Sequence, residues 1–355
     1  MMNNNSRKIL ATMTCLVMLV SILAAFSGAL ATGGADRSET LMIYGNSAGD
    51  GKDVWLIEQA KAAGFNIQCV EVPGGDLLNR LIAEKNNQQA DVIWGMNAMS
   101  YEAMKKEDLL LQFAAPSWVS DCAPALGDPE GYYYPIVVQP LLLAYNTTTF
   151  TDAVPTDWVE AITDEKFAGT INILSLGGTT SQCIIAGILV RYREDGAEHN
   201  ISAEGWEVMR KYIQENHVNH PEEDWFGNFT NATFPITNIW GSGYIQRQLE
   251  MNFTDMGYAT PEVGVPYVVE QLAITKNTKK AALAQEFIEW FGSPEIQGEF
   301  SALFGTAPAC DSALAKASPE IQEMLESVHP QEIDWKFVGD NRDAWMEKIE
   351  LEFVL

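Results

Sequence analysis

Apolar residues recur along this chain with two alternating periods. Short apolar runs, which are typical of buried strands, are followed by segments in which apolar residues return every three or four positions, the period of an amphipathic helix. The first such series predicts strands at Leu41–Tyr44, Ile67–Val72 and Asp91–Gly95, a helix at Asp53–Ala63 closed by Gly64, and a helix capped by Asp76. This order of elements favours an α/β fold with a parallel sheet that is covered by helices on both faces.

The second half of the chain repeats this rhythm after a long extended run, Tyr133–Asn146. It predicts strands at Thr170–Leu174 and Pro235–Trp240, a helix at Ser181–Tyr192, and a helix marked by Trp206, Met209 and Ile213. Another extended run, Val265–Ile274, would return the chain to the first half. A chain that leaves a domain and comes back forms two lobes around a cleft, and we expect the hinge at Leu141–Asn146 and Val265–Ile274.

The predicted domains are therefore discontinuous. We expect lobe 1 to comprise 40–140 plus 268–330, lobe 2 to comprise 147–264, and 331–355 to form a C-terminal helix that packs on the lobes. That last segment carries Trp335, Phe337, Trp345, Ile349 and Phe353. Ligands of open α/β sheets bind beyond the carboxyl ends of strands, so the loops that follow the predicted strands are the candidate site.

The first 31 residues have the pattern of a secretory signal peptide. Arg7 and Lys8 precede an uncharged apolar run, and Ala29-Leu30-Ala31 supplies small residues at the spacing that signal peptidase prefers. We expect cleavage before Thr32 and an exported, periplasmic or cell-surface protein. The alternative is an uncleaved anchor, because the run is long enough to cross a bilayer. Cys15 lies too early in the run for a lipoprotein cysteine.

Charge narrows the possible partners. The formal net charge is −26, which argues against nucleic acid and anionic lipid as partners because both would be repelled. An acidic protein suits cationic solutes, although a solvated, self-repelling surface accounts for the same charge.

Cysteines and asparagines indicate possible modifications. An even number of cysteines beyond the signal peptide allows two disulfides or buried thiols, and the sequence does not choose between them: Cys69, Cys122, Cys183 and Cys310. Glycosylation triplets matter only if the host modifies exported proteins, and they begin at Asn146, Asn200, Asn228, Asn231 and Asn252.

Two segments resemble a known protein family. Residues 277–309, NTKKAALAQEFIEWFGSPEIQGEFSALFGTAPA, read as two helices divided by Gly292 and Ser293-Pro294, and they resemble the C-terminal segment of extracellular solute-binding proteins of ABC importers. Residues 74–97, GGDLLNRLIAEKNNQQADVIWGMN, resemble a segment of the thiamine-binding members. The resemblance extends over most of the chain beyond the signal peptide. It implies the two-lobed periplasmic-binding-protein fold of type II, a small-molecule ligand, and a separate membrane permease and ATPase as partners.

The resemblance does not identify the ligand, because the motifs depart from each subgroup. Thiamine binders have an acid where this chain has Asn97. Polyamine binders carry Trp-x-Asp where this chain reads Val268-Val269-Glu270, so the acid is kept and the aromatic is lost. Ferric binders use paired tyrosines in the second lobe, where only Tyr244 stands. We expect a thiamine-like or other organic cation first, then a phosphorylated or phosphonate solute, a polyamine, and last ferric ion.

The candidate ligand-binding residues are aromatic, amide and hydroxyl side chains at the ends of predicted strands and at a glycine-rich helix start, together with one acid. They are Tyr44, Asn46, Ser47, Trp94, Asn97, Thr179, Thr180, Ser181, Trp225, Trp240, Tyr244, Tyr267 and Glu270. Aromatic faces suit cations through cation–π contacts, and the amides at a helix start suit a phosphate or carboxylate. Core packing of Trp94, shielding of a hydrophobic edge by Trp225, and simple capping by Gly177–Ser181 are the alternatives.

We expect no enzyme, no cofactor and a monomer. The chain has no Gly-x-Ser-x-Gly elbow, HExxH helix or phosphate-binding P-loop. The sequence His217–Asp224, HVNHPEED, matches no catalytic zinc signature and contains a proline, so it favours a solvated loop over a metal site. An exported hydrolase is the rival class, and no motif supports it.

Overall fold

The computed structural model describes residues 35–354 with the exception of 73 and 221. The expected signal peptide, its cleavage site and Cys15 lie outside the described residues. The described helices and strands all belong to one compact unit, which begins at Arg37. Among the residues that the structure describes, no helix has both the length and the apolar character that a bilayer crossing requires.

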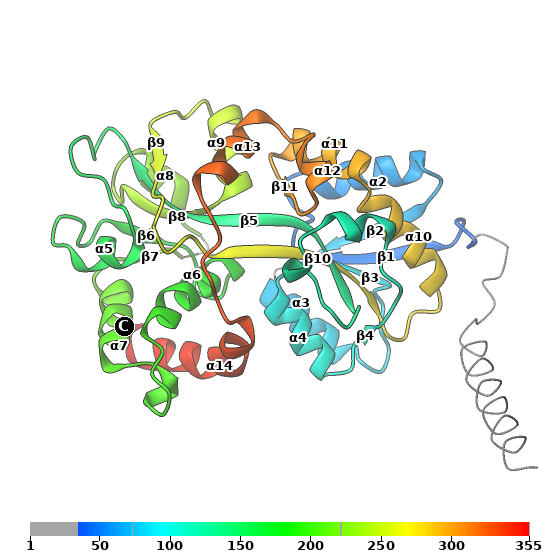
Figure 1. The fold of residues 1–355 in the computed structure, drawn as a ribbon, viewed down its shortest axis with the longest axis horizontal. Helices are drawn as coiled ribbons and strands as arrows, with labels where there is room; N and C mark the ends of the chain where they lie inside the picture. The colour runs from blue at the N-terminus through cyan, green and yellow to red at the C-terminus, as the bar shows by residue number, and fades with distance from the viewer. Residues whose placement is uncertain (1–34, 73, 221, 355) are drawn as a thin grey trace, which may run out of the picture. The chain divides into compact units, whose positions relative to one another are not determined.

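The strands form one long sheet in which two strands run through both halves of the molecule (Figure 1). Their order is β2 (Asn66–Glu71), β1 (Thr40–Gly45), β3 (Val92–Gly95), β10 (Tyr267–Thr275), β5 (Tyr133–Asn146), β8 (Ile236–Trp240), β6 (Ile171–Ile173) and β7 (His217–Val218). Three short strands join this path at its centre: β4 (Leu110–Leu111) pairs with β10, and β9 (Met256–Tyr258) and β11 (Ala307–Pro308) pair with β5.

The parallel sheet expected from the sequence is present only at the two ends. Strand β1 pairs in parallel with β2 and β3, and β6 pairs in parallel with β7 and β8. Strand β10 is antiparallel to β3 and β5, and β5 is antiparallel to β8. The sheet is therefore mixed, because the strands that carry the chain between the halves run against the strands they join.

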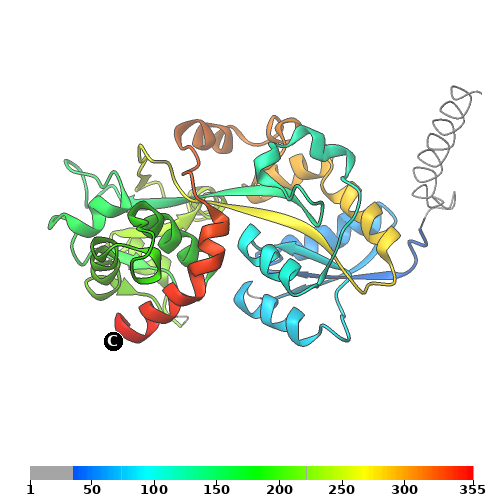
Figure 2. The same cartoon turned by 60° about the horizontal axis from the view of Figure 1, so that its bottom comes forward.

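Helices cover both faces of the sheet in each half (Figures 1 and 2). In the half built on β1–β3 they are α2 (Lys52–Ala62), α3 (Gly74–Ala83), α4 (Ala98–Lys106), α10 (Ala281–Phe291), α11 (Pro294–Phe304) and α12 (Asp311–Leu314). In the half built on β6–β8 they are α5 (Trp158–Thr163), α6 (Thr179–Leu189), α7 (Ala203–Gln214), α8 (Trp225–Thr230) and α9 (Gly241–Glu250). Helix α13 (Pro319–Ser327) and helix α14 (Trp335–Glu352) close the chain.

Short 3₁₀ turns complete the described elements. They are η1 (Ser117–Asp121), η2 (Pro124–Leu126), η3 (Val190–Tyr192) and η4 (Glu198–Asn200). Helix α14 packs against η4, where the Trp345 indole N–H donates to the His199 carbonyl at 2.9 Å, and it also contacts α4. The C-terminal helix thus touches elements of both halves, and the lobe limits expected above stay a prediction.

The helix boundaries follow from local chemistry. Ser202, Asp157 and Asp334 cap α7, α5 and α14 with their side chains, because each accepts a hydrogen bond from an N–H of the first turn. Helix α11 opens with Pro294 and ends at Gly305, whose φ of 62° is left-handed and therefore favours glycine. Asp76 lies in the first turn of α3 rather than at its cap, since that helix begins at Gly74.

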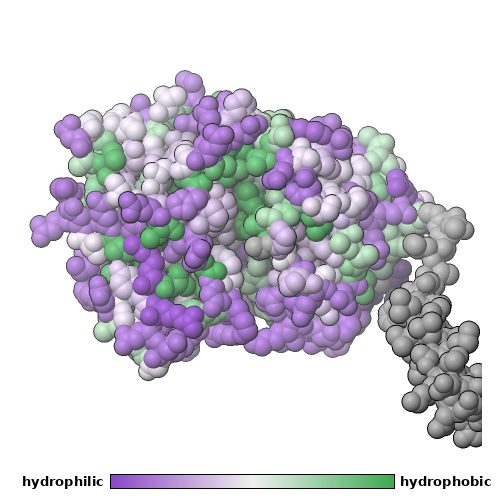
Figure 3. Space-filling model, in the orientation of Figure 1, coloured by the Kyte–Doolittle hydropathy of each residue, from purple (hydrophilic) through white to green (hydrophobic). Residues whose placement is uncertain are grey.

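Apolar surface gathers near the middle of the face shown in Figure 3, whereas hydrophilic residues dominate both ends. The buried core of the described residues contains separate clusters. One buried cluster joins Tyr44, Leu77 and Ile93 with α4 in the first half, and a second joins Leu142, Ile185 and Trp345 in the other half. Each half therefore has a core of its own, which is the arrangement of two lobes on shared strands.

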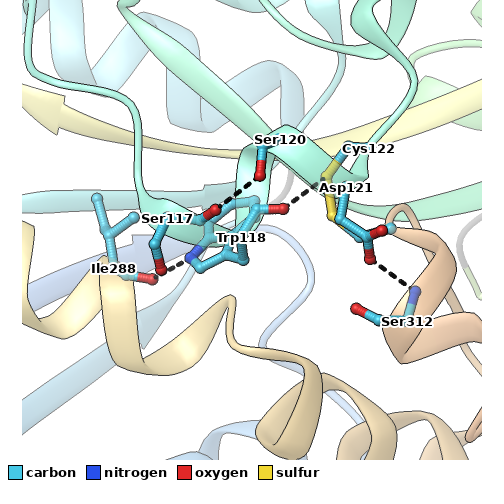
Figure 4. The surroundings of a disulfide bond; sticks show 8 residues. Ser117, Trp118, Ser120, Asp121, Cys122, Ile288 and Ser312 are labelled. Carbon is cyan, nitrogen blue, oxygen red and sulfur yellow. Dashed lines mark hydrogen bonds between the residues drawn. A yellow bond between two sulfur atoms is a disulfide. The ribbon is translucent and has the colours of Figure 1, made fainter.

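One disulfide links distant segments, Cys122 to Cys310, and Cys69 and Cys183 are free thiols. Figure 4 shows the bond beside Trp118, whose indole N–H donates to the Ile288 carbonyl at 3.3 Å. The Ser312 N–H donates to the Asp121 carboxylate at 2.7 Å on the other side. The sequence left two disulfides or buried thiols open, and the structure has one disulfide and two free thiols.

We predict that the Cys122→Ser/Cys310→Ser double variant loses about 2–5 kcal/mol of unfolding free energy, because the bond closes a loop of 188 residues in the unfolded chain. Denaturant unfolding of the oxidised protein and the variant measures this. A Cys69→Ser variant is the matched control and should stay close to the parent, while equal stability of parent and double variant would contradict the prediction.

Candidate solute-binding cleft

A cavity of about 480 Å³ opens where the strand ends of both halves meet the crossing strands. Its wall is built from loops that follow β1, β3, β6 and β7 and from the last residues of β2 and β8. The starts of α2, α3, α6, α8 and α9 and the crossing strands β5 and β10 complete it. This is the edge of an α/β sheet where ligands bind, and the volume suits a small organic molecule.

Eight of the thirteen residues predicted from the sequence line this cavity. They are Asn46, Ser47, Thr179, Thr180, Ser181, Trp225, Trp240 and Glu270. The first two follow β1, the next three open α6, and the tryptophans come from α8 and the end of β8. Chain segments that are more than 200 residues apart in the sequence, around Asn46 and Glu270, thus meet at one wall.

The other five predicted residues serve the fold. Trp94 is fully buried and packs edge-on against Phe291 with ring centroids 5.4 Å apart. Tyr44 is buried, and the Arg80 guanidinium donates to its hydroxyl at 2.6 Å. The Tyr244 hydroxyl donates to the Met256 carbonyl at 2.8 Å, and the Tyr267 hydroxyl donates to the Val328 carbonyl at 3.3 Å. The hydroxyls of the three tyrosines are thus used inside the fold.

The fifth residue, Asn97, caps a helix. Its side-chain oxygen accepts the Ser100 N–H at 3.0 Å, and its side-chain amide nitrogen lies 3.4 Å from the Cys183 sulfur on α6. Asparagine is among the best capping residues, so its place after a strand reflects the start of α4. The contact with Cys183 joins an element of the first half to one of the second.

The loops after β1 and β3 are held together by Asn46. The side-chain oxygen of Asn46 accepts the Met96 N–H at 2.6 Å. Gly95 lies at a φ of 92°, and a side chain there would come within 2.3 Å of that same oxygen. The close approach therefore requires glycine at 95, and Asn46 contributes to the cavity wall and to its rigidity at once.

The start of α6 presents backbone amides to the cavity. Its N-cap is Gly178, which provides no side-chain hydrogen bond, and Thr179 and Thr180 are half-buried in the wall. The Ser181 hydroxyl instead donates to the Leu174 carbonyl at 2.9 Å. A helix start without a side-chain cap leaves N–H groups and the positive end of the helix dipole for an acceptor.

Two tryptophans form the apolar part of the wall. The rings of Trp225 and Trp240 are tilted, with centroids 6.1 Å apart. The Arg247 guanidinium carbon lies 5.2 Å from the Trp225 centroid and 5.6 Å from the Trp240 centroid. Cation–π attraction depends on the electron density of the ring, and Arg247 already draws on it, so the wall offers a solute mainly apolar contact.

Glu270 is a half-buried acid of the cavity wall, and it comes from the crossing strand β10. It lies at a bulge of β10, where the register against β5 shifts between Glu270 and Gln271. A bulge re-aims the side chains beside it. The Gln139 amide nitrogen donates to the Glu270 carboxylate at 3.3 Å, and Ser47 is a second hydrogen-bond partner.

The pKa of Glu270 is raised above its ordinary value because burial disfavours the charged form. The charge of Lys52 and the hydrogen bonds from Ser47 and Gln139 oppose this rise. The ion pair that the structure shows for Lys52 is with Asp50, at 3.7 Å. Among the described residues, no cation forms an ion pair with Glu270 within 4.0 Å, so its charge is compensated only in part.

Several wall residues were not predicted from the sequence. They are Gly49, Asp50, Lys52, Glu71, Gly74, Met96, Gln139, Leu141, Leu174, Ser175, Gly178, Asn219, His220, Glu223, Ser242 and Val268. Gln139 was detectable as an amide inside an otherwise apolar run, and Lys52 as a cation at a helix start, where the dipole disfavours it.

The loop after β7, for which the sequence favoured a solvated loop over a metal site, also lines the cavity. The His217 ring nitrogen lies 2.6 Å from the Glu223 carboxylate, and His220 and Glu223 both belong to the wall. Among the described residues, no group of three or more histidine, cysteine, aspartate or glutamate side chains is arranged to hold a metal ion.

Known proteins match this chain over most of its length. The family model described as bacterial extracellular solute-binding protein matches residues 58–326. A probable ABC transporter periplasmic-binding protein, y4fP, of Sinorhizobium fredii is 32% identical over 316 residues, which cover 89% of this chain and 87% of the relative. A putative 2-aminoethylphosphonate-binding periplasmic protein of Salmonella typhi is 32% identical over 132 residues, 36% of this chain and 37% of the relative.

Solved structures share the fold at low sequence identity. Iron-bound HitA of Pseudomonas aeruginosa has a TM-score of 0.75 at 14% identity, with 88% of this chain and 99% of that chain covered. AfuA of Actinobacillus pleuropneumoniae with fructose-6-phosphate bound has a TM-score of 0.71 at 17% identity, with 89% and 99% covered. The expected two-lobed type II fold is confirmed by these structures.

We predict that Glu270→Gln stabilises the ligand-free protein between pH 5 and pH 8.5, with a gain that grows as the pH rises through the folded pKa of Glu270 and is constant above it. The raised pKa means that the folded state holds its proton above the unfolded pKa, so stability is lost as the pH rises through the folded pKa, and glutamine removes that loss. Melting temperatures across this range measure the difference, with the exposed Glu299→Gln as control. A variant that is less stable than the parent at high pH would contradict the unpaired-acid description.

Proposed function

Because this chain belongs to the family of bacterial extracellular solute-binding proteins, we propose that its cleft captures a small organic solute that carries a cationic nitrogen. The chain is the solute-binding component of an ABC transporter, so it acts with a membrane permease. The relatives are binding proteins, and no enzyme family is indicated. Members of this family are exported proteins. We also propose that residues 1–31 are a signal peptide cleaved before Thr32 and that the protein is a monomer.

The observation that carries this proposal is the incomplete compensation of Glu270. A buried carboxylate without an ion-pair partner is unfavourable, and this one lies on the wall of an open cavity with two neutral hydrogen-bond partners. An ammonium or other cationic nitrogen of a solute would supply the missing charge. Burial of the carboxylate thus becomes a source of affinity once the solute enters.

A second group on the solute is favoured by the start of α6. Its uncapped amides and the hydroxyls of Thr179 and Thr180 suit a phosphonate, phosphate or carboxylate. Lys52 is a buried cation on the same wall. We therefore favour a solute with a cationic and an anionic end, and the 2-aminoethylphosphonate named for a partial relative is of this class. A thiamine-like cation would use Glu270 and the apolar tryptophan wall without the start of α6.

Ferric ion is disfavoured although iron-binding proteins share the fold. Tyrosine does not occur among the described residues that line the cavity, and Tyr244 and Tyr267 donate their hydroxyl hydrogens to backbone carbonyls. The acids of the wall are spread over two loops and two strands: Asp50, Glu71, Glu223 and Glu270. Hard cations require several oxygens at one point, and the described residues provide no such cluster.

Capture would proceed by closure of the two lobes about β5 and β10. Lobe 1 would comprise 40–140 plus 268–330, and lobe 2 would comprise 147–264. Closure is consistent with two contacts that α6 of the second half makes with the first half. A side chain at Gly74 would come within 2.8 Å of the Thr179 hydroxyl, and Asn97 meets Cys183. These contacts would separate when the cleft opens, so solute binding and lobe closure support each other.

We predict that 2-aminoethylphosphonate, or another solute with an amine and an anionic end, raises the melting temperature of the protein from Thr32 onward. A solute at 100 times its dissociation constant stabilises by ~2.7 kcal/mol. The panel should include thiamine, its phosphates, polyamines, ethylphosphonate and ferric citrate. Glu270→Gln should reduce the response to amines at least tenfold in affinity, since it removes a charged partner, and Glu299→Gln should not.

The panel separates the alternatives. A response to thiamine and polyamines alone would place the solute at Glu270 without the α6 subsite. A response to ethylphosphonate that equals the response to its amine would contradict the role of Glu270, as would full amine binding by Glu270→Gln. A response to ferric citrate alone would contradict the proposed solute class.

A further inference from the structure

Gln139 is a buried amide in the middle of the crossing strand β5. It is 5% exposed, its neighbours Val138 and Leu141 are apolar, and its side chain reaches the cavity wall. A buried amide on a central strand is costly unless its hydrogen bonds are made. Its partners therefore indicate what the side chain does.

The orientation of the Gln139 amide is fixed by the start of α9. Its carbonyl oxygen accepts the Ser242 backbone N–H at 3.1 Å. An oxygen is required at that position, because an amide nitrogen cannot accept a hydrogen bond from an N–H. The other atom of the amide is then its nitrogen, which donates to the Ser242 hydroxyl at 3.0 Å and to the Glu270 carboxylate at 3.3 Å.

A donor held in place beside a carboxylate stabilises the charged form. The groups that face Glu270 are Ser47 and Gln139 as hydrogen-bond partners and Lys52 as a cation, while Glu270 itself raises the pKa of the buried Tyr101 as a lesser cause after burial. Asp50 adjoins Lys52 and reduces what that cation provides. Gln139 is thus a hydrogen-bond partner of Glu270 whose amide is also held by the Ser242 N–H.

We propose that Gln139 is the positioning residue that stabilises the ionised form of Glu270 and fixes the direction of its carboxylate toward the solute nitrogen. This inference rests on the proposed function of Glu270 as the amine subsite. It assigns to the start of α9 a part in specificity, because the Ser242 N–H sets the orientation of the amide that orients the acid. Gln139 also ties β5 to α9 through its two bonds with Ser242, so the test has to separate that structural role from an effect on Glu270.

The test is a double-variant cycle of Gln139→Leu and Glu270→Gln in the ligand-free protein. Melting temperatures should be measured from pH 5 to pH 8.5, above the sequence pI of about 4.4. With Glu270 present, Gln139→Leu should destabilise more as the pH rises, because the ionised acid loses its donor. In the Glu270→Gln background this extra loss should vanish, leaving a coupling on the order of 2 °C or more at pH 8.5 that fades toward pH 5.

Control variants separate positioning from simple packing. Ser242→Ala keeps the backbone N–H that orients the amide and should retain the pH-dependent coupling. Gln322→Leu changes a glutamine that donates to the Ala317 carbonyl far from the cavity in sequence, and it should show no coupling to Glu270. A coupling that is absent, or that is the same at every pH, would overturn the proposal, because a merely structural bridge does not depend on the charge of Glu270.

Solute binding provides a second readout. The probe is 2-aminoethylphosphonate, or whichever amine of the panel binds the parent protein. Gln139→Leu should move the onset of binding to higher pH, and its loss of affinity should be smaller at high pH than at low pH. A uniform loss at all pH values would contradict positioning. If no amine binds the parent protein, the proposed solute is wrong, and the ligand-free coupling still decides whether Gln139 controls the ionisation of Glu270.

Discussion

The antiparallel pairing of β5 with β10 is the interaction on which the rest of the molecule depends. Tyr267–Ala273 pairs with Tyr133–Pro140, and beyond it β5 continues into the second half to pair with β8. Each half has its own core, and these two strands connect the halves. A two-strand connection has few side chains that must repack when the halves rotate. It also brings Gln139 and Glu270 to the base of the cavity.

The bulge at Glu270 shows how this connection serves binding as well as folding. An acid in the middle of a sheet would be directed into one face or the other, and the register shift allows it to reach the cavity. Its burial costs stability in the absence of solute, and strained or unpaired groups of this kind are typical of functional sites. The fold tolerates the cost because neutral donors and a distant cation compensate it in part.

Much of the fold could be predicted from the sequence, because the pattern of apolar residues reports local structure directly. The run Tyr133–Asn146 is observed as β5 with the predicted limits, and the helices on either side of Gly292 were also confirmed. The mixed sheet was not predicted, since periodicity does not carry strand direction. The two-disulfide possibility failed at Cys69 and Cys183 because pairing depends on which cysteines the fold brings together.

The candidate site was predicted less completely, for reasons that particular residues make clear. Trp94 and Asn97 stand at a strand end as expected of ligand contacts, yet one fills the core and the other caps α4. Gln139 and Lys52 contribute to the wall from positions whose neighbours in sequence are structural. Only the packing of the two halves determines which polar atoms remain for a solute.

A structure of the protein with an amine-bearing solute that binds it tests the central claim most directly. The account predicts the cationic nitrogen within about 3 Å of the Glu270 carboxylate, and a solute whose nitrogen lies elsewhere in the cleft would contradict it.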